Sequence, residues 1–390
     1  MEKLRLRFRR DDATNFSDWT EVCLEDVGEI RTGTTPNIKD LKNIGGSYLW
    51  VTPTDITGKE VTVTATTLSK EGMDVAREIP ANSVLVTCIA SIGKNCVLRN
   101  KGSCNQQINS ITPKFGYDVD FLYYLICRKE SVLHSFAGHG GMEILNKSEF
   151  SKLIFKFPSF EEQQKIAAFF TALDEKIRLS EQKLNLISKI KKGIAQKLFA
   201  QDLRFQSYNK PWKEKNTLSQ IAVVTMGQSP SSESYNEDSE GLPLIQGNAD
   251  IVDGFTKPQR YTTEVTKRCQ EGDVILSVRA PVGELGIASE ESCIGRGVCA
   301  IRANDKSNTV FIYQFLQAKK KQWKTLEQGS TFTAVSGEDI KTFEVLVPTK
   351  EEQQKIAAFF TAFDKKIDIE KKKLNELHRL KTAFMQQMFV

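Results

Sequence analysis

The feature that most constrains this chain is a long internal repeat. The twelve-residue segment EEQQKIAAFFTA occupies residues 161–172 and recurs without a substitution at residues 351–362. A second pair of matching segments lies ahead of the two copies, because Leu6–Phe8 is echoed by Leu203–Phe205. The 190-residue interval is far longer than the repeat unit of a solenoid. A chain of 390 residues with such a repeat is expected to contain two modules, each a globular domain followed by a conserved tail.

The two tails have the heptad pattern of long helices. Apolar side chains recur at alternating steps of four and three residues over 166–198 and over 356–388. Ser159 and Thr349 are suitable helix caps, since each precedes two glutamates that favour the positive end of a helix dipole. An ordinary amphipathic core helix is the alternative, but the pattern is long for one compact domain. The sequence predicts two helices of roughly 60 Å that pack on each other, antiparallel because each follows its own domain.

Polar residues interrupt the heptad pattern at the same two steps in both tails. Ser180 and Glu370 occupy one step, and Lys191 and Lys381 occupy the other. A polar residue at a packed position can fix the register of a helix pair at some loss of stability. These residues are therefore expected to set the helix alignment, and replacing both lysines by leucine is expected to raise thermal stability.

The two segments between the tails share an order of short β-rich runs and one helix-like apolar segment. The sequence therefore predicts an α+β chain, with two pseudo-symmetric α/β domains joined by two long antiparallel coiled-coil helices. The expected strands are 48–52, 61–64, 83–87 and 153–157 in the first half and 243–245, 273–277, 298–301 and 343–347 in the second; the expected helices within the halves are 120–133 and 310–326. The expected bounds are 1–157 and 207–347 for the domains and 158–206 and 348–390 for the conserved helices.

The motifs of common catalytic classes are missing from the sequence. It has no GxxxxGK[ST] phosphate loop, no Asn/Asp-Pro-Pro-aromatic motif of amino methyltransferases and no recognisable PD…(D/E)xK nuclease arrangement. Three histidines leave little material for a His-based metal site or triad. Cys88, Cys96 and Cys104 are evenly spaced but lie in β-like stretches without a nearby histidine, which favours buried thiols over metal ligands. A non-catalytic binding subunit without a metal is therefore expected.

Cellular location is indicated by the cysteines and by the apolar runs. The eight cysteines form no CxxC pair, which favours reduced thiols over a disulfide framework. The apolar runs are too short for a membrane span, and no apolar region follows the basic first ten residues as in a secretory signal. The protein is therefore expected to be located in the cytoplasm.

Taken with the repeat, several motifs resemble the specificity (S, HsdS) subunit of type I restriction-modification systems. They are Leu6–Phe8 followed by Trp19, Leu203–Phe205 followed by Trp212, and a tail start of the form Pro-x-x-Glu-x-Gln-x-x-Ile-Ala that occurs twice. The resemblance covers essentially the whole chain. It implies that each variable half is a target recognition domain for one half of a split DNA site, and that the conserved helices separate these domains.

The resemblance also implies the partners. They are double-stranded DNA, two methyltransferase (M) subunits docked on the helices, and restriction (R) subunits in the full enzyme. S-adenosylmethionine would belong to M, and ATP and Mg²⁺ to R, so this chain is expected to hold no cofactor. Phe169 and Phe359 lie outside the heptad positions of the identical stretch, and an exposed ring at both sites is a candidate anchor for two identical partners. The alternative is that both rings pack on their own domain.

Base edges are read by side chains that can make paired hydrogen bonds from elements that reach a groove. Residues of this kind in predicted turns are the candidates for base contacts, and ordinary solvated turns are the alternative for each. Arg296 is the boldest choice, since Gly295 and Gly297 would let the backbone approach DNA closely. The candidates are Arg31, Thr34, Asn37, Lys94, Asn95 and His139 in the first half and Gln228, Ser231, Arg279, Arg296, Ser330 and Thr331 in the second.

Two other function classes stay open on the sequence. A coiled-coil scaffold that assembles protein partners without DNA would leave the divergence of the two halves unexplained. A hydrolase would need a nucleophile and a base that no motif here provides. The formal net charge of +5 does not by itself indicate a nucleic-acid-binding protein, because the globular halves are slightly acidic. DNA contact would need local clusters of Arg and Lys, or a partner that neutralises phosphates.

Overall fold

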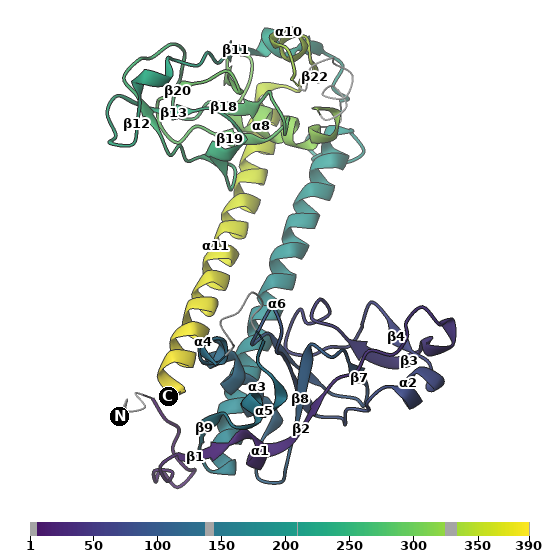
Figure 1. The fold of residues 1–390 in the computed structure, drawn as a ribbon. Helices are drawn as coiled ribbons and strands as arrows, with labels where there is room; N and C mark the ends of the chain where they lie inside the picture. Colours follow the sequence, from purple (N-terminus) through teal and green to yellow (C-terminus); the bar gives the residue numbers. More distant parts are fainter. Residues whose placement is uncertain (1–5, 137–143, 209, 324–333, 390) are drawn as a thin grey trace. The chain divides into compact units, whose positions relative to one another are not determined.

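The computed structural model describes residues 6–136, 144–208, 210–323 and 334–389 (Figure 1). It divides into two compact units: unit 1 comprises residues 1–181 with 373–390, and unit 2 comprises residues 182–372. Each unit therefore combines one globular half with the start of one long helix and the end of the other. Among the described residues, no helix combines the length and the apolar character that a membrane span requires.

Both long helices predicted from the heptad pattern are present. Helix α6 is Phe160–Phe199 and helix α11 is Lys350–Met388. The hydroxyl of Ser159 accepts a hydrogen bond from the Glu162 backbone N–H at 3.4 Å, which confirms it as a helix cap. Thr349 caps α11 in the same way, at 3.4 Å from the Glu352 nitrogen.

The antiparallel direction of the helices is seen inside each unit. In unit 1 the rings of Phe170 and Phe389 are 5.7 Å apart, and further along α6 the Asp174 carboxylate is 2.6 Å from Lys381 Nζ. The residue number rises on one helix while it falls on the other, so the two segments run in opposite directions. Unit 2 repeats the arrangement with the pairs Phe360–Phe199 and Asp364–Lys191.

Unit 1 is built on an antiparallel sheet of four strands in the order β2-β8-β5-β6, with a smaller sheet β4-β3-β7 and the pair β1-β9. Its strands are β1 Thr20–Cys23, β2 Gly28–Thr32, β3 Ile44–Val51, β4 Thr67–Leu68, β5 Ser83–Thr87, β6 Asn95–Leu98, β7 Ser103–Cys104, β8 Ile108–Pro113 and β9 Ile154–Phe157. Its shorter helices are α1 Leu24–Val27, α2 Lys70–Val75, α3 Val119–Arg128, α4 Glu130–Ser135 and α5 Lys147–Ser151, with a 3-10 turn η1 at Leu41–Asn43.

Unit 2 has the same order of elements and more strands. Its main sheets run β11-β21-β18-β19-β15-β14 and β12-β16-β13-β20-β17, beside the pair β10-β22. The strands are β10 Lys215–Thr217, β11 Ala222–Met226, β12 Tyr235–Asn236, β13 Leu242–Ile245, β14 Ile251–Val252, β15 Phe255–Thr256, β16 Tyr261–Thr262, β17 Arg268–Cys269, β18 Val274–Ser277, β19 Leu285–Ile287, β20 Ser292–Ile294, β21 Val298–Ala303 and β22 Glu344–Leu346. The helices are α7 Leu218–Ile221, α8 Thr309–Ala318 and α10 Gly337–Lys341, with 3-10 turns η2 at Ser232–Ser234 and η3 at Asn248–Asp250.

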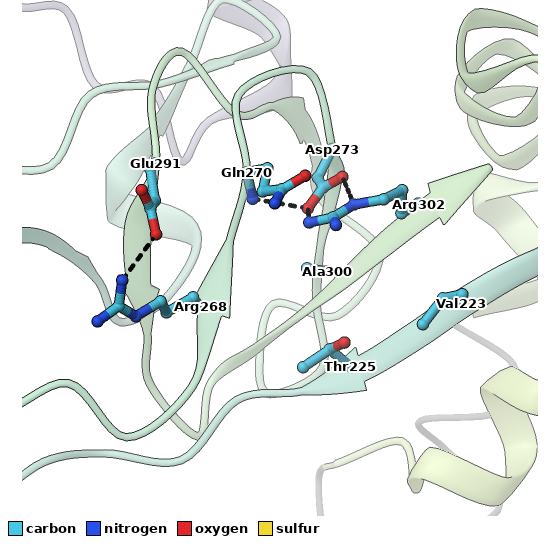
Figure 2. A pocket seen from close by; sticks show the side chains of 8 residues that line it. All are labelled: Val223, Thr225, Arg268, Gln270, Asp273, Glu291, Ala300 and Arg302. Carbon is cyan, nitrogen blue, oxygen red and sulfur yellow. Dashed lines mark hydrogen bonds and ion pairs between the residues drawn. The ribbon is translucent and has the colours of Figure 1, made fainter. Parts of the chain in front are cut away.

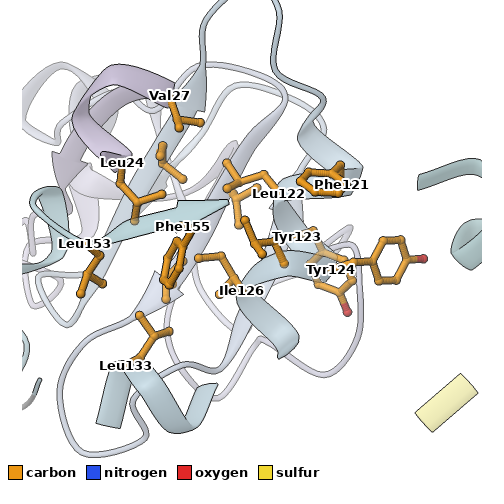
Figure 3. Close-up of a cluster of buried hydrophobic side chains, with 14 of the residues drawn as sticks. Leu24, Val27, Phe121, Leu122, Tyr123, Tyr124, Ile126, Leu133, Leu153 and Phe155 are labelled. Carbon is orange, nitrogen blue, oxygen red and sulfur yellow. The ribbon is translucent and has the colours of Figure 1, made fainter. Parts of the chain in front are cut away.

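The core of each unit lies between the main sheet and one helix. In unit 1 the apolar side chains of α3, among them Phe121 and Leu122, pack with Leu24 and Phe155 (Figure 3). The Asp118 carboxylate starts α3 by accepting a hydrogen bond from the Phe121 backbone N–H at 2.8 Å. The equivalent helix α8 starts with an Asn308 cap at 3.1 Å from the Phe311 nitrogen. The same local signal therefore positions the core helix in both halves.

Three of the predicted elements differ in the structure. Residues 61–64 do not form a strand, because the Asp55 carboxylate accepts hydrogen bonds from the backbone N–H groups of Thr52 and Ala65, both at 2.8 Å, and folds the segment into a loop. The helix predicted for 120–133 is interrupted at Lys129, where α3 gives way to α4. The helix predicted for 310–326 is interrupted in the same way: α8 ends at Ala318, residues 320–323 are helical again, and residues 324–326 lie outside the described residues.

Candidate nucleic-acid interface

A buried ion pair holds the start of each long helix against the segment that precedes the globular half. Arg7 donates to the two carboxylate oxygens of Glu162 through Nε at 3.1 Å and Nη2 at 2.7 Å, and the Glu162 side chain is fully buried. In unit 2, Nη2 of Arg204 lies 3.0 and 3.2 Å from the two oxygens of Glu352. The repeated arginine and the repeated glutamate therefore form an equivalent ion pair inside each unit.

The repeated glutamine of the tail is also a structural residue. The amide of Gln163 donates to the Pro158 carbonyl at 3.0 Å and to the Gly116 carbonyl at 3.3 Å, and its oxygen accepts from the Asp118 N–H at 2.9 Å. Buried backbone groups need such partners, because an unpaired one destabilises the fold. Gln353 makes the matching contacts with Pro348, Lys306 and Asn308.

Two of the predicted base-contacting loops lie side by side in unit 2. The Gln228 backbone N–H donates to the Ile294 carbonyl at 2.9 Å, and the Arg296 N–H donates to the Ser229 hydroxyl at 3.2 Å. These contacts use backbone atoms of Gln228 and Arg296, and both residues are exposed. The structure thus brings together two polar side chains that are 68 positions apart in sequence.

A third loop joins this cluster through the residue before Arg279. The Val278 backbone N–H donates to the Gly297 carbonyl at 2.9 Å, and Arg279 itself is exposed. Gly297 is required by packing, because a Cβ there would lie 2.1 Å from the Gln246 carbonyl oxygen. Close packing against the residue after β13 is thus a reason for this glycine within the fold, and its close approach to DNA stays a prediction. We call Gln228, Arg279 and Arg296 the unit 2 loop cluster.

Unit 1 contains the matching cluster, with one member that the sequence analysis missed. The Thr34 N–H donates to the Cys104 carbonyl at 2.8 Å, as Gln228 does to Ile294, and the Cys88 N–H donates to the Gln107 carbonyl at 2.8 Å. Gln106 is the exposed residue at the position of Arg296. The 190-residue offset would have found it, since residue 296 corresponds to residue 106.

Two of the predicted base-contacting residues lie in strands, which contradicts their placement in turns. Arg31 lies in β2, and its guanidinium donates to the Glu29 carboxylate at 2.8 and 2.9 Å and to the Glu78 carbonyl at 2.8 Å. These hydrogen bonds hold the pKa of Glu29 below its usual range. Asn95 is buried at the start of β6, where its amide donates to the Gly93 carbonyl at 3.1 Å.

The remaining candidates divide by their contacts. The Thr34 hydroxyl accepts from the Arg77 backbone N–H at 2.7 Å, and Lys94 Nζ donates to the Pro53 carbonyl at 2.8 Å. Asn37 and Ser231 lie in exposed turns, and the Ser231 N–H donates to Glu264 at 2.8 Å. The other three candidates lie outside the described residues: His139, Ser330 and Thr331.

The two candidate partner anchors are half-buried rather than exposed. Phe169 packs edge-on against Phe8 at 5.8 Å between ring centroids and against Phe384 at 5.1 Å. Phe359 packs in the same way against Phe205 at 5.7 Å. The expectation of exposed rings is therefore wrong, because the repeated Leu-Arg-Phe segment covers them. Partner binding through their remaining surface stays a prediction.

Unit 2 also has a polar depression of about 250 Å³ on its main sheet (Figure 2). Arg302 donates to both oxygens of the buried Asp273 at 2.8 Å, and Arg268 lies 3.0 Å from Glu291. The charged side chains among the described lining residues thus form two ion pairs. In unit 1 the positions of Asp273 and Arg302 carry Ser83 and Thr112, whose hydroxyls are 2.7 Å apart.

The evenly spaced cysteines are buried, as the sequence predicts. Burial raises the pKa of the Cys88 thiol to about 11 and that of Cys96 to about 12. Such thiols stay protonated and unreactive at neutral pH. Within the described ranges, no group of three or more His, Cys, Asp or Glu side chains is arranged to hold a metal ion.

Known proteins similar to this chain share its two-fold repeated organisation. A family model described as "Type I restriction modification DNA specificity domain" matches residues 16–189 and 209–379, so it matches the chain twice. The chain is 31% identical over 253 residues, 62% of its length and 59% of the relative's, to a candidate specificity subunit of type I restriction enzyme MjaX from Methanocaldococcus jannaschii. The MjaIX specificity subunit of the same organism is 22% identical over 95% of this chain and 92% of its own.

A solved structure shows the same fold over nearly the whole length. It belongs to a study of complex assembly and conformational transition of a type I restriction-modification system, and it matches with a TM-score of 0.64 at 22% identity. The match covers 95% of this chain and 97% of that chain. With the duplicated frame, the paired loop clusters and a family model that matches both halves, this chain belongs to the DNA specificity subunits of type I restriction-modification systems.

Proposed function

We propose that each globular half contacts one half of a bipartite site in double-stranded DNA. Unit 1 would use the loops around Thr34 and Gln106, and unit 2 would use its loop cluster. One observation carries this assignment: an equivalent framework presents different side chains at equivalent loop positions. Gln106 in unit 1 stands where unit 2 has Arg296. Arg and Gln favour different base edges, guanine and adenine respectively, so the two units would differ in the bases they accept.

The proposed bounds follow the repeat. Residues 1–157 and 207–347 would be the target recognition domains, and residues 158–206 and 348–390 would be the spacer helices. The spacer helices would set the distance between the half-sites and dock two M subunits, which bind S-adenosylmethionine. R subunits, which use ATP and Mg²⁺, would complete a cytoplasmic multi-subunit enzyme in which this chain is non-catalytic. A scaffold without DNA recognition is less well supported, because it gives no role to the differing loops.

The test is the methylation pattern of DNA in cells that carry this chain with its M subunit. Single-molecule sequencing of the modified DNA is expected to show a motif of two short specified parts with an unspecified spacer. Cells with M alone are the control and are expected to show no motif. A continuous motif, or methylation that does not depend on this chain, would contradict the proposal.

A further inference from the structure

Unit 1 carries an exposed turn with apolar and cationic side chains between β2 and β3. The turn comprises residues 37–43 and ends in η1. Leu41 is 79% exposed, and Ile38 is exposed as well. Lys39 and Lys42 stand on either side of Leu41 in the sequence, and both are exposed. We call Ile38, Lys39, Leu41 and Lys42 the apolar–basic turn.

Hydrogen bonds within this segment fix its backbone. The Asn37 carbonyl accepts from the Asp40 backbone N–H at 3.2 Å and from the Asn43 side-chain amide at 3.0 Å. The Asp40 carboxylate starts η1 by accepting from the Lys42 backbone N–H at 3.1 Å. The one acidic residue of 37–43 thus orders the backbone, and the segment has two cations against one anion.

Helix α2 supports the turn from one side. The Ser69 hydroxyl donates to the Lys42 carbonyl, and a Cβ on Gly72 would lie 2.0 Å from the Asn43 carbonyl oxygen, so the helix packs directly on the turn. Val75 follows Gly72 by three positions, which places it on the same side of α2, and it is 64% exposed. Within unit 1, α2 and β3 lie at the end remote from α6 (Figure 1). A supported turn thus presents its apolar and cationic side chains away from the spacer helix.

Unit 2 has an equivalent turn, η2. In unit 1 the Ser69 backbone N–H donates to the Asn43 carbonyl at 3.1 Å, and in unit 2 the Thr263 N–H donates to the Ser234 carbonyl at 3.2 Å. In both units the strand after the turn pairs antiparallel with the strand that ends just before this donor, β3 with β4 and β12 with β16. The three residues of η1 therefore correspond to the three residues of η2.

The side chains at these equivalent positions differ in kind. Leu41 and Lys42 are the first two residues of η1, whereas Ser232 and Glu233 are the first two of η2. The fold that the units share thus accepts a small polar residue and an acidic one there. Because packing does not require the apolar and basic residues of unit 1, their role is expected at the surface.

The apolar–basic turn lies along β3 from a candidate base-contacting loop. The Asn105 backbone N–H, next to Gln106, donates at 2.9 Å to the carbonyl of Val51 at the end of β3, whereas η1 adjoins the start of that strand. The eight residues of β3 place the turn at most about 23 Å from Val51. Major and minor grooves alternate along one side of a duplex every half turn, roughly 17 Å. A duplex whose major groove meets Gln106 would therefore present its minor groove near the turn.

The minor groove of DNA complements this surface in charge and in size. Rows of phosphates border the groove, and lysine ammonium groups suit phosphates because they act as point charges with several donors. Proteins that bend DNA insert apolar side chains such as Leu and Ile into the minor groove. The major groove admits a helix or a β-ribbon, and a short turn is neither.

We propose that the apolar–basic turn binds the minor groove of duplex DNA beside the half-site contacted by unit 1. Lys39 and Lys42 would contact phosphates, and Leu41 would wedge against the base-pair edges and bend the duplex. This inference rests on the proposed function and adds to it a contact that positions unit 1 on DNA without reading the sequence.

The test uses the full chain assembled with its M subunit and two duplexes, one with the methylated motif in longer flanking DNA and one with a scrambled sequence. One variant is Lys39→Gln with Lys42→Gln, and the other is Leu41→Ala. The matched control is Lys114→Gln with Lys152→Gln, two exposed lysines of unit 1 near α1. Affinity is measured over a series of salt concentrations, and energy transfer between dyes at the duplex ends reports the bend. Thermal unfolding checks the fold, and size-exclusion chromatography checks the assembly with M.

Each phosphate contact contributes about 0.9 to the slope of log affinity against log salt concentration. We expect the lysine variant to lower this slope by about 1.8 and to weaken both duplexes by a similar factor, on the order of tenfold. Leu41→Ala is expected to keep the slope and to reduce the bend, because it removes the wedge and no charge. The control is expected to keep both the slope and the bend.

Three results would overturn the proposal. They are an unchanged slope in the lysine variant, an unchanged bend in Leu41→Ala, and loss of M from either folded variant, which would make the turn a protein-docking surface. If the wild-type complex did not prefer the motif duplex, the proposed function would fail. The difference in slope between the lysine variant and the control would still report on the turn.

Discussion

The two units of this chain use equivalent contacts inside and different residues at their loop surfaces. Arg7 with Glu162 in unit 1 has its counterpart in Arg204 with Glu352 in unit 2. At the loop surface the correspondence ends, and Gln106 stands where unit 2 has Arg296. The comparison teaches that the internal contacts hold each unit together without the exposed loop side chains. The identity of a loop residue can therefore differ between the units, because its side chain is not needed for packing.

Differences also occur inside the units, and there they come in matched sets. Unit 1 joins Tyr124, Asp174 and Lys381, with 2.7 Å from Tyr124 Oη and 2.6 Å from Lys381 Nζ to the carboxylate. Unit 2 uses Gln314, Asp364 and Lys191 at the equivalent positions. A change at one position is accompanied by another group that can still reach the same carboxylate. The identities of hydrogen-bonded internal residues are thus constrained together. The identity of an exposed loop residue can change without a matching change at another position.

The largest expected effect tests whether the two frames are equivalent. Arg7→Ala leaves Glu162 buried without its partner, and Arg204→Ala does the same to Glu352. Each change is expected to lower the free energy of unfolding by about 3–5 kcal/mol, the usual result of breaking a buried ion pair from one side. Chemical denaturation of the two variants measures this loss. A large loss of stability in one variant with none in the other would show that the two ion pairs are not equivalent.

A smaller effect is expected where the units use different polar pairs. Arg302→Thr leaves the buried Asp273 without its main partner and is expected to cost about 2 kcal/mol. Adding Asp273→Ser recreates the hydroxyl pair of Ser83 and Thr112 and is expected to restore most of the stability. Denaturation of the single and the double variant gives the coupling between the two positions. If the double variant were no more stable than the single one, the pairs would not be interchangeable.

The smallest effects on stability concern the lysines at the interrupted heptad step. The structure reverses the expectation that leucine stabilises here, because both lysines are ion-paired. Lys381→Leu is expected to cost about 1–2 kcal/mol, since Asp174 is only 23% exposed. Lys191→Leu is expected to cost less than about 1 kcal/mol, since Asp364 is 45% exposed and keeps its hydrogen bond from Gln314. Thermal melting of the two variants checks the order, and a gain in stability for both would support the original expectation.

Sequence patterns predicted the elements that depend on local or periodic signals. The heptad spacing predicted α6 and α11, and the Ser159 and Thr349 caps were found at their starts. One failure came from side-chain hydrogen bonds to the backbone, which residue periodicity does not encode. The strand expected at residues 61–64 is displaced by hydrogen bonds to Asp55, which no periodicity reveals.

The candidate site was also predicted only in part, because local hydrogen bonds occupy some of the side chains. Gln228, Arg279 and Arg296 are exposed on adjoining loops, as turn composition suggested. Arg31 and Asn95 had the right chemistry, but their side chains are used inside unit 1, and residue type alone cannot show this. Gln106 was missed because its turn contains no glycine, although the internal repeat assigned it the same place as Arg296.

The most direct test of the central claim compares the methylated motifs produced by Arg296→Ala and by Gln106→Ala. Both residues are exposed, so neither change is expected to disturb the frame. If each unit contacts one half-site, Arg296→Ala relaxes a position in one half of the motif and Gln106→Ala relaxes a position in the other half. Each relaxation corresponds to the loss of about 1–3 kcal/mol of discrimination at that base pair. Sequencing of modified DNA from cells that carry each variant with M shows the outcome. Relaxation of both halves by one variant, or of the same half by both, would contradict the division of labour between the units.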